Sequence, residues 1–360
     1  MFFISDFMIG QSCLTTEQML SINKSTLNII AVSSEKEQEP GLKDKCRLAG
    51  ADVRRILNLD EHKNFRLLAK QIAKLIRKED IHCVHVQNNW QMMLVVYAKY
   101  ILLKCYDIKI LYTIHAFRNN HPVKSIIARI TIGCMLGLFA TKVICMSSYL
   151  KQKFRFLGKK IALLPLGISN EYFHSEHPAL PLNGLQMIFP AQFRKGKNQD
   201  VIIKAFAKHI ELCKDYQSHL YLPGNGEFYE DMKKLASDLC IADRISFPGR
   251  ITKRDLLQMY LKCNIGVIAS NSETFGQSIV EPFVLGRCIV STHVGIADDI
   301  ITNGENGYFF SSQDELVNVF GKLYKNQELI VNAGIMNFKG RNTFSWDNVT
   351  KQYIELINKL

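Results

Sequence analysis

Short apolar runs alternate with amphipathic stretches along the whole chain. Runs of a few apolar residues bounded by turn residues predict buried strands, and apolar positions spaced three and four apart predict helix faces. In the first half, Leu68, Ile72, Leu75 and Ile76 share one such face. The strands predicted there are Phe2–Ile4, Leu27–Val32, Ile81–Val86, Ile108–Ile114, Lys142–Met146 and Ile161–Leu164. Strands that alternate with helices favour a parallel sheet covered by helices on both faces.

A break in this pattern separates two such series. Residues 169–185 contain Pro178, Pro181 and Gly184 with little periodicity, which is typical of a linker. The strands predicted after it are Met187–Phe189, His219–Leu222, Ile245–Phe247, Ile265–Ala269, Ile289–Ser291 and Tyr308–Phe310, with helices at Gln199–Ile210 and Lys253–Leu261. The sequence therefore predicts an α/β protein with two Rossmann-like, doubly wound domains, residues 1–170 and 171–340. A last amphipathic helix is expected in residues 341–360.

Composition agrees with a globular protein and limits its chemistry. Of 360 residues, 47% are hydrophobic and 22% are charged, which suffices for a full core. The first residues lack the basic segment of a signal peptide, and the longest apolar run, 130–140, is short of the ~20 residues that span a bilayer. A cytoplasmic protein is therefore expected. The ten cysteines form no Cys-x-x-Cys pair and most lie in apolar contexts, which favours buried thiols over metal or redox chemistry.

Charge is unevenly distributed between the two halves. Residues 1–180 contain 25 Lys and Arg against 14 Asp and Glu, whereas residues 181–360 contain 20 against 19. One basic stretch, residues 151–160, also carries Phe154 and Phe156. Two interpretations remain open: a solvated helix end, or a contact with an anionic membrane surface. No nucleic-acid-binding motif accompanies the charge, so no nucleic-acid partner is expected.

The segment 270–307 carries the most specific chemistry. Glu273 and Glu281 lie eight positions apart around the turn Thr274–Gln277, between a predicted strand and a predicted helix. Backbone N–H groups at a helix N-terminus can hold a phosphate. Carboxylates on either side can accept hydrogen bonds from sugar hydroxyls. This arrangement suits a ligand with phosphate in its middle and hydroxyl groups at both ends, such as a nucleotide-sugar.

Each glutamate also has a purely structural interpretation. Ser278 and Glu281 fit the capping-box pattern, in which Glu281 would only stabilise the start of a helix, and Pro282 would then lie in the first turn. Glu273 could equally be a solvated loop charge.

The ordered set of motif residues favours the ligand-binding interpretation, and for Glu281 both roles could coexist. Glu273 and Glu281, with Phe275-Gly276 between them, are followed by Gly286 and by Gly304-x-Asn306-Gly307. This set resembles the corresponding region of the retaining glycosyltransferases of family 4, which have the GT-B fold of two Rossmann-like domains facing a cleft. The resemblance implies that Glu273 contacts the donor sugar and Glu281 the ribose. It also implies that the N–H groups of Phe275, Gly276 and Gln277 face the diphosphate, and that the C-terminal helix returns to the first domain.

The loop after the first strand of the second domain resembles the family's cationic segment. There the family carries an Arg and, five residues later, a Lys that bind the diphosphate. Lys197 matches the Lys, but Gln192 stands at the Arg position, and Arg194 is the candidate replacement. The resemblance also puts Arg250 and Ile251 beside the nucleotide base.

Two further candidates come from the first domain. By resemblance, His115 reaches the donor sugar and Gly10 lies near the phosphate, although the family has a glycine pair where this chain has one. Residues 88–90 are candidates for the acceptor pocket. No Asp-x-Asp pair that would hold Mg²⁺ occurs, and the family works without such a metal, so neither metal nor cofactor is expected. The absence of P-loop and Gly-x-Gly-x-x-Gly motifs argues against an ATPase and a dehydrogenase.

The sequence therefore predicts a retaining glycosyltransferase that moves a hexose from a nucleoside-diphosphate sugar to a hydroxyl acceptor. His115, Glu273 and Lys197 are the expected catalytic residues. A lipid-linked or polysaccharide acceptor at the inner face of the cell membrane is expected from the basic first domain. Two alternatives remain: a nucleotide-sugar epimerase of the same fold, and a sugar-nucleotide-binding protein without catalysis.

Overall fold

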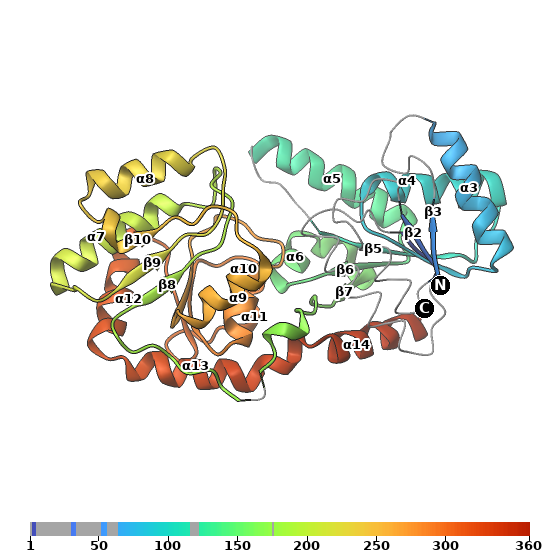
Figure 1. The fold of residues 1–360 in the computed structure, drawn as a ribbon. Coiled ribbons are helices and arrows are strands. Elements are labelled where there is room, and N and C mark those ends of the chain that lie inside the picture. Colours follow the sequence, from blue (N-terminus) through green and yellow to red (C-terminus); the bar gives the residue numbers. More distant parts are fainter. Residues whose placement is uncertain (1, 5–29, 34–51, 56–63, 116–121, 175) are drawn as a thin grey trace. The chain divides into compact units, whose positions relative to one another are not determined.

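The computed structural model describes residues 2–4, 30–33, 52–55, 64–115, 122–174 and 176–360. The chain divides into two compact units (Figure 1). Unit 1 comprises Met1–Ser169 with Trp346–Leu360, and unit 2 comprises Asn170–Ser345. The predicted boundaries at 170 and 340 lie beside these unit boundaries. Each unit is described by itself below.

Unit 1 is built on a seven-stranded parallel sheet in the order β3-β2-β1-β4-β5-β6-β7. Its strands are β1 (Phe2–Ile4), β2 (Ile30–Ser33), β3 (Asp52–Arg55), β4 (Cys83–Val86), β5 (Lys109–Thr113), β6 (Lys142–Cys145) and β7 (Ile161–Leu163). The described helical segments are α3 (Phe65–Lys78), α4 (Asn89–Tyr97), η1 (Ala98–Leu103), α5 (Pro122–Phe139), α6 (Ser148–Lys153), η2 (Arg155–Lys160) and α14 (Trp346–Asn358).

The core of unit 1 follows from the apolar faces of these elements. Strands β4 and β5 are buried almost throughout, which matches the continuous apolar runs expected of a parallel sheet. Leu68, Ile72 and Ile76 of α3 are buried in the same core cluster, as their spacing predicts. The edge strand β3 was not predicted from the sequence, because its residues Asp-Val-Arg-Arg contain no apolar run.

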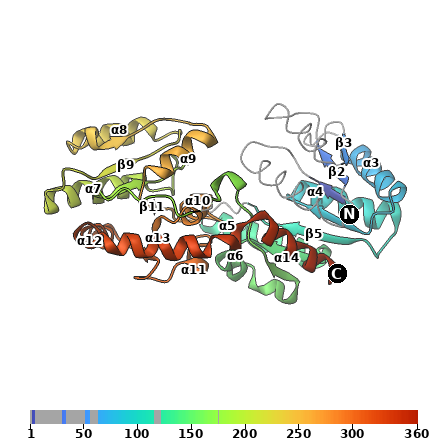
Figure 2. The same ribbon diagram turned by 60° about the horizontal axis from the view of Figure 1, so that its bottom comes forward.

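The C-terminal helix α14 is part of unit 1 although almost 180 residues of unit 2 precede it (Figure 2). Trp346 at its start lies against Gly167, where an added Cβ would meet the indole ring at 2.4 Å. Tyr353, fully buried, hydrogen-bonds His85 at 2.7 Å. These contacts tie the end of the chain to the sheet of unit 1.

Unit 2 repeats the plan with a six-stranded parallel sheet in the order β10-β9-β8-β11-β12-β13. Its strands are β8 (Gln186–Ile188), β9 (His219–Tyr221), β10 (Ile245–Ser246), β11 (Ile265–Ile268), β12 (Cys288–Ser291) and β13 (Gly307–Phe309). Its helical segments are η3 (Asn170–Tyr172), α7 (Gln199–Cys213), α8 (Tyr229–Asp238), η4 (Ala242–Arg244), α9 (Lys253–Leu261), α10 (Gln277–Val284), α11 (Ala297–Ile300), α12 (Gln313–Lys325), α13 (Glu328–Gly340) and η5 (Arg341–Phe344).

In both sheets the order in which successive strands are added reverses at one place. The chain of unit 2 runs outward from β8 to β10 on one side and from β11 to β13 on the other. Because parallel crossovers are right-handed, α7 and α8 cover one face and α10 and α11 the other. The prediction of two doubly wound α/β domains is confirmed, and the carboxyl ends of β8 and β11 form the switch point where such sheets bind ligands.

Among the described residues, no helix combines the length and the hydropathy that crossing a membrane requires.

Candidate functional site

The loops that follow β8 and β11 meet at the switch point of unit 2. The two strands are neighbours in the sheet, so their carboxyl ends lie side by side. The backbone N–H of Asn271 donates to the Gly196 carbonyl at 2.8 Å, and the Asn198 side chain donates to the Ala269 carbonyl at 2.8 Å. These hydrogen bonds hold the cationic loop after β8 beside the loop after β11, which carries Glu273.

This arrangement brings Lys197 into contact with Glu273. The ammonium group forms an ion pair with the carboxylate oxygen Oε1, which also accepts a hydrogen bond from Ser270 Oγ at 2.7 Å. The two side chains are only 12% and 15% exposed. The resemblance assigned Glu273 to the donor sugar and Lys197 to the diphosphate. These two residues, 76 positions apart in the chain, therefore converge on one shielded spot.

Helix α10 begins beside this pair. Gly276 is its N-cap residue with φ +95°, a left-handed conformation that favours glycine, and the helix runs from Gln277. Its first N–H groups have no partner within the helix, so they are available to an anion. Phe275 is buried and packs edge-on against Phe344 at 6.2 Å, which fixes the turn.

The capping-box interpretation of Glu281 is wrong. Ser278 lies inside α10 rather than at its N-cap, and Pro282 is the sixth helical residue instead of lying in the first turn. Glu281 accepts a hydrogen bond from the Tyr260 hydroxyl of α9 at 2.8 Å. Because the helix start is set by Gly276, the side chain of Glu281 is free for another role.

The environment of Glu281 is unusual for a carboxylate. Burial raises its pKa to about 7, an effect that the Tyr260 hydrogen bond and the nearby Lys253 charge reduce. The Tyr260 side chain is completely buried, and its pKa lies well above its ordinary value for the same reason. A half-buried carboxylate whose pKa is raised to about 7 costs folding energy when ionised, and such groups are enriched at functional sites.

The glycine-rich turn 223–226 does more than reverse the chain. Two backbone hydrogen bonds join the loops after β8 and β9. The Ala191 N–H donates to the Pro223 carbonyl at 3.1 Å, and the Phe193 N–H donates to the Asn225 carbonyl at 3.0 Å. A Cβ added at Gly224 would lie 1.9 Å from the Ala191 carbonyl oxygen. This glycine is therefore required for the close approach of the two loops, in addition to its part in the turn.

The remaining predicted residues of unit 2 are more exposed. Gln192 and Arg194 follow β8 with exposed side chains, Arg250 is exposed after β10, and Ile251 is half-buried beside it. The Gln192 carbonyl accepts a hydrogen bond from the Gln199 side chain at 3.1 Å. All four lie on loops at the carboxyl edge of the sheet. The backbone carbonyl of Arg194 accepts a hydrogen bond from the Lys197 N–H at 3.1 Å. The role of the Arg194 guanidinium as replacement cation stays a prediction.

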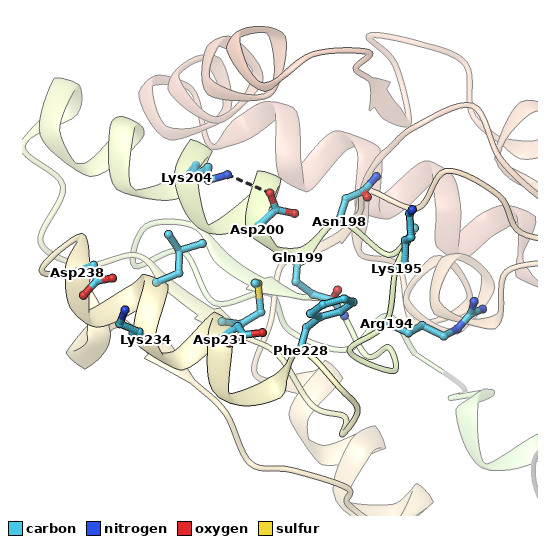
Figure 3. Close-up of a pocket in the computed structure, with 13 residues that line it drawn as sticks. Arg194, Lys195, Asn198, Gln199, Asp200, Lys204, Phe228, Asp231, Lys234 and Asp238 are labelled. Carbon is cyan, nitrogen blue, oxygen red and sulfur yellow. Dashed lines mark hydrogen bonds and ion pairs between the residues drawn. The ribbon is translucent and has the colours of Figure 1, made fainter. Parts of the chain in front are cut away.

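Arg194 instead lines a pocket of about 550 Å³ between the cationic loop and helix α8 (Figure 3). Phe228 lies in the middle of the view in Figure 3. On the wall of the pocket, the Lys204 ammonium forms an ion pair with the Asp200 carboxylate at 3.0 Å. The lining mixes cations and carboxylates: Arg194, Lys195, Lys204 and Lys234 against Asp200, Asp231 and Asp238. Neither Glu273 nor Glu281 lines it. The pocket therefore adjoins the switch-point loop without containing the two glutamates.

In unit 1, His115 follows β5 and belongs to a chain of polar side chains. Its Nε2 donates to the Gln87 side-chain oxygen. Gln87 also contacts His85, whose ring bridges Thr113 and Tyr353 at 2.7 Å each. Burial lowers the pKa of His115 to about 4, and burial together with His115 lowers that of His85 to about 3. His115 is therefore a neutral imidazole at pH 7.

The residues proposed for the acceptor pocket have structural partners. Asn88 is the N-cap of α4 and accepts a hydrogen bond from the Gln91 N–H at 2.8 Å. Asn89 accepts from the Tyr112 hydroxyl at 2.6 Å, and Trp90 packs edge-on against Phe65 at 5.5 Å. Gly10 lies outside the described residues. Within the described part of the chain, no cluster of His, Cys, Asp and Glu could hold a metal ion.

Sequence reasoning missed the residues that support the site. Ser270, Asn198 and Tyr260 each bond a predicted residue or its loop, and the sequence positions of Ser270 and Tyr260 did not mark them. Asn198 adopts φ +55°, which asparagine tolerates better than most residues. The adjoining Lys197-Asn198 pair after a strand was the available signal.

Comparisons with known proteins agree with this geometry. Residues 29–172 match the family described as Glycosyltransferase Family 4, and residues 173–335 match Glycosyl transferases group 1. An uncharacterized glycosyltransferase of Methanocaldococcus jannaschii is 25% identical over 222 residues, 60% of each chain. A D-inositol 3-phosphate glycosyltransferase of Acidothermus cellulolyticus is 23% identical over 211 residues, 53% of this chain and 46% of that protein. The matches thus span about half the length of these curated relatives.

Solved structures share the fold of the whole chain. Anabaena Alr3699/HepE, crystallised with UDP and glucose, superimposes with a TM-score of 0.78 at 15% identity, covering 100% of this chain and 99% of that one. The lipopolysaccharide outer core galactosyltransferase WaaB, in its apo form, gives 0.78 at 14% identity with the same coverage. The family matches are to glycosyltransferases, which does not favour the epimerase alternative. By its two consecutive family matches and its architecture, the chain belongs to the glycosyltransferases of the GT-B fold.

Proposed function

We propose that the protein is a retaining glycosyltransferase that moves a hexose from a nucleoside-diphosphate sugar to a hydroxyl acceptor. The observation that carries this proposal is the convergence of Lys197 and Glu273 at the switch point of unit 2, beside the N-terminus of α10. A cation, a carboxylate and free helical N–H groups at one place suit a sugar diphosphate.

Each group has a distinct task in this proposal. When the donor binds, Lys197 leaves its ion pair with Glu273 and donates hydrogen bonds to the diphosphate instead. It then neutralises the charge that develops on the leaving group. Glu273, released from the ion pair, accepts hydrogen bonds from the sugar and favours positive charge at the anomeric carbon. Glu281 accepts from the ribose hydroxyls. None of the motif residues is assigned as a covalent nucleophile, so the acceptor attacks from the face that the diphosphate leaves, which retains the configuration.

His115 is proposed to contact the sugar from unit 1. Its pKa of about 4 keeps the ring uncharged. A neutral imidazole offers one donor and one acceptor without repelling an oxocarbenium-like centre. The chain Tyr353–His85–Gln87–His115 would then hold the ring in one orientation.

The identity of the ligands is inferred from relatives. Since HepE was crystallised with UDP and glucose, UDP-hexoses are the first donors to test. WaaB is a lipopolysaccharide galactosyltransferase, and the first half of this chain is basic. We therefore propose a lipid-linked or polysaccharide acceptor of surface-polysaccharide assembly, met at the cytoplasmic face of the membrane.

The proposal is tested in two stages. A thermal-shift screen across sugar nucleotides identifies the donor, because a ligand at ~100 times its Kd adds roughly 2.7 kcal/mol of stability. Incubation with donor and candidate acceptors then measures the release of nucleoside diphosphate, and NMR of the product gives the anomeric configuration. Glu273→Gln keeps the size of the side chain and should abolish transfer.

The matched control is Glu230→Gln, an exposed glutamate on α8 that pairs with Lys233. Unchanged turnover in Glu273→Gln would contradict the assignment. Epimerised sugar nucleotide without free nucleoside diphosphate would favour the epimerase, and donor binding without either product would favour a non-catalytic protein.

A further inference from the structure

Helix α5 of unit 1, the teal helix in Figure 1, exposes an apolar stripe. Ile126, Ile130, Cys134 and Leu138 follow one another at intervals of four residues, and all four are exposed. Leu138 is 73% exposed and Ile130 is 54% exposed. An ordinary surface helix turns such a stripe toward the core. Exposed contiguous apolar surface of this kind marks an interaction site.

The segment η2 continues this stripe. A Cβ added at Gly133 would lie 2.2 Å from Cζ of Phe156, so the Phe156 ring covers this glycine of α5. Phe156 nevertheless stays 56% exposed. The Lys160 ammonium donates to the Gly137 carbonyl, which joins η2 to the last turns of α5. We call the five residues Ile126, Ile130, Cys134, Leu138 and Phe156 the α5 stripe.

Cations lie beside the α5 stripe, in a stretch of sequence that is devoid of acidic residues. Between Asp107 and Glu171 the sequence contains ten Lys and Arg residues and no Asp or Glu. Arg155 and Lys159 of η2 are exposed, and Arg129 of α5 is half-buried. Lys160 and Lys142 cap backbone carbonyls of Gly137 and Lys159. The surface is therefore apolar along its middle and positively charged along its η2 side.

We propose that the α5 stripe and the cations of η2 form a docking surface for an anionic lipid bilayer. An apolar stripe inserts among acyl chains at the interface, while lysine and arginine beside it contact lipid phosphates. Charge favours an anionic occupant over a second copy of the chain. The chain carries a net charge of +12, so a second copy would bring a surface of the same sign, and like charges across an interface disfavour association. A nucleic acid would satisfy the cations but would leave the apolar stripe in water.

This inference deepens the membrane part of the proposed function and is independent of sugar transfer. The test is co-sedimentation of the full-length protein with phosphatidylcholine vesicles, with and without about a third of phosphatidylglycerol. We expect binding to the anionic vesicles, weakening as salt rises, since exposed charges are screened over about 10 Å at 0.1 M. Binding to neutral vesicles should be at least ~10-fold weaker.

Two double variants separate the apolar and cationic contributions. Ile130→Ser with Leu138→Ser removes apolar contact, and Arg155→Glu with Lys159→Glu reverses charge; each should lower vesicle affinity at least ~10-fold. The matched controls lie in unit 2: Leu212→Ser, which is 61% exposed, and Lys262→Glu, which is also exposed. These controls should bind as the unmodified protein does, and all variants should keep the thermal shift with the donor.

Several results would overturn the inference. One is absence of binding to anionic vesicles. A second is loss of binding in the charge variant with full binding in the stripe variant, which would indicate a general polyanion site. A third is a stripe-dependent dimer in light scattering with no vesicle binding, which would assign the surface to a second copy. Transfer activity is not read in this test, so failure of the docking surface and failure of the proposed function are distinguishable.

Discussion

Replacing Glu281 by Gln should stabilise the ligand-free protein at high pH while it weakens donor binding. Burial raises the pKa of Glu281 from 4.5 to about 7. At about 1.36 kcal/mol per unit, ionised Glu281 costs up to about 3 kcal/mol of folding free energy. Because the residue keeps some exposure, about 1–2 kcal/mol is the expected cost after solvent screening. Glutamine keeps the acceptor for the Tyr260 hydroxyl and carries no charge to bury.

The sign of the pH dependence follows from the raised pKa. Between pH 4.5 and about 7 the folded state holds the proton of Glu281 more tightly than the unfolded state does. The stability that this proton contributes is present at low pH and is lost as pH rises through about 7. The melting temperature of Glu281→Gln should therefore gain on the unmodified protein between about pH 5 and 8, then run parallel to it.

Thermal melts from about pH 5 to 9 measure this difference. For a unit of this size 1 kcal/mol corresponds to about 2–4 °C. Because about 40% of the cost is already present at pH 5.5, the variant should gain about 1–5 °C at pH 8.5 relative to its gain at pH 5.5. A gain that is equal at both pH values would refute the reasoning. The stabilisation by the donor should be smaller in the variant, because the ionised carboxylate accepts from ribose hydroxyls more strongly than an amide does. If the donor raises the melting temperature of the variant as much as that of the unmodified protein, Glu281 has only a structural role.

Two further predictions concern the loops of unit 2. Lys197→Met should lower kcat by about 10²–10³-fold, the range for loss of one preorganised charge-stabilising group. Rescue of turnover by Lys197→Arg would show that the charge matters and not the packing, whereas a normal kcat in Lys197→Met would refute the role of Lys197. Gly224→Ala should destabilise the protein by about 2–4 kcal/mol in thermal or urea unfolding, because its Cβ would lie 1.9 Å from the Ala191 carbonyl oxygen. The control, Gly304→Ala, has φ +87° with open space around its Cβ and should cost about 1–2 kcal/mol; equal losses in both variants would refute the close-approach argument.

The sequence by itself determined the two-domain α/β architecture and most strand positions. Strands such as β5 and β11 are buried on both faces, so each is a continuous apolar run that marks its own limits. The turn that carries Glu273, Gly276 and Gln277 was also legible, because its residues are neighbours in the chain. Strand β3 was not, since the polar residues of an edge strand leave no apolar run.

The tertiary structure alone decided which distant residues meet. Lys197 touches Glu273 because β8 lies beside β11, and His85 bonds Tyr353 because α14 returns to unit 1. Likewise, the apolar sequence of α5 does not reveal that its stripe faces outward. Hydrophobic periodicity is a local signal that specifies a strand or helix. The order of strands in a sheet, and the face that each helix leaves uncovered, depend on packing between segments far apart in the chain, which no local pattern records.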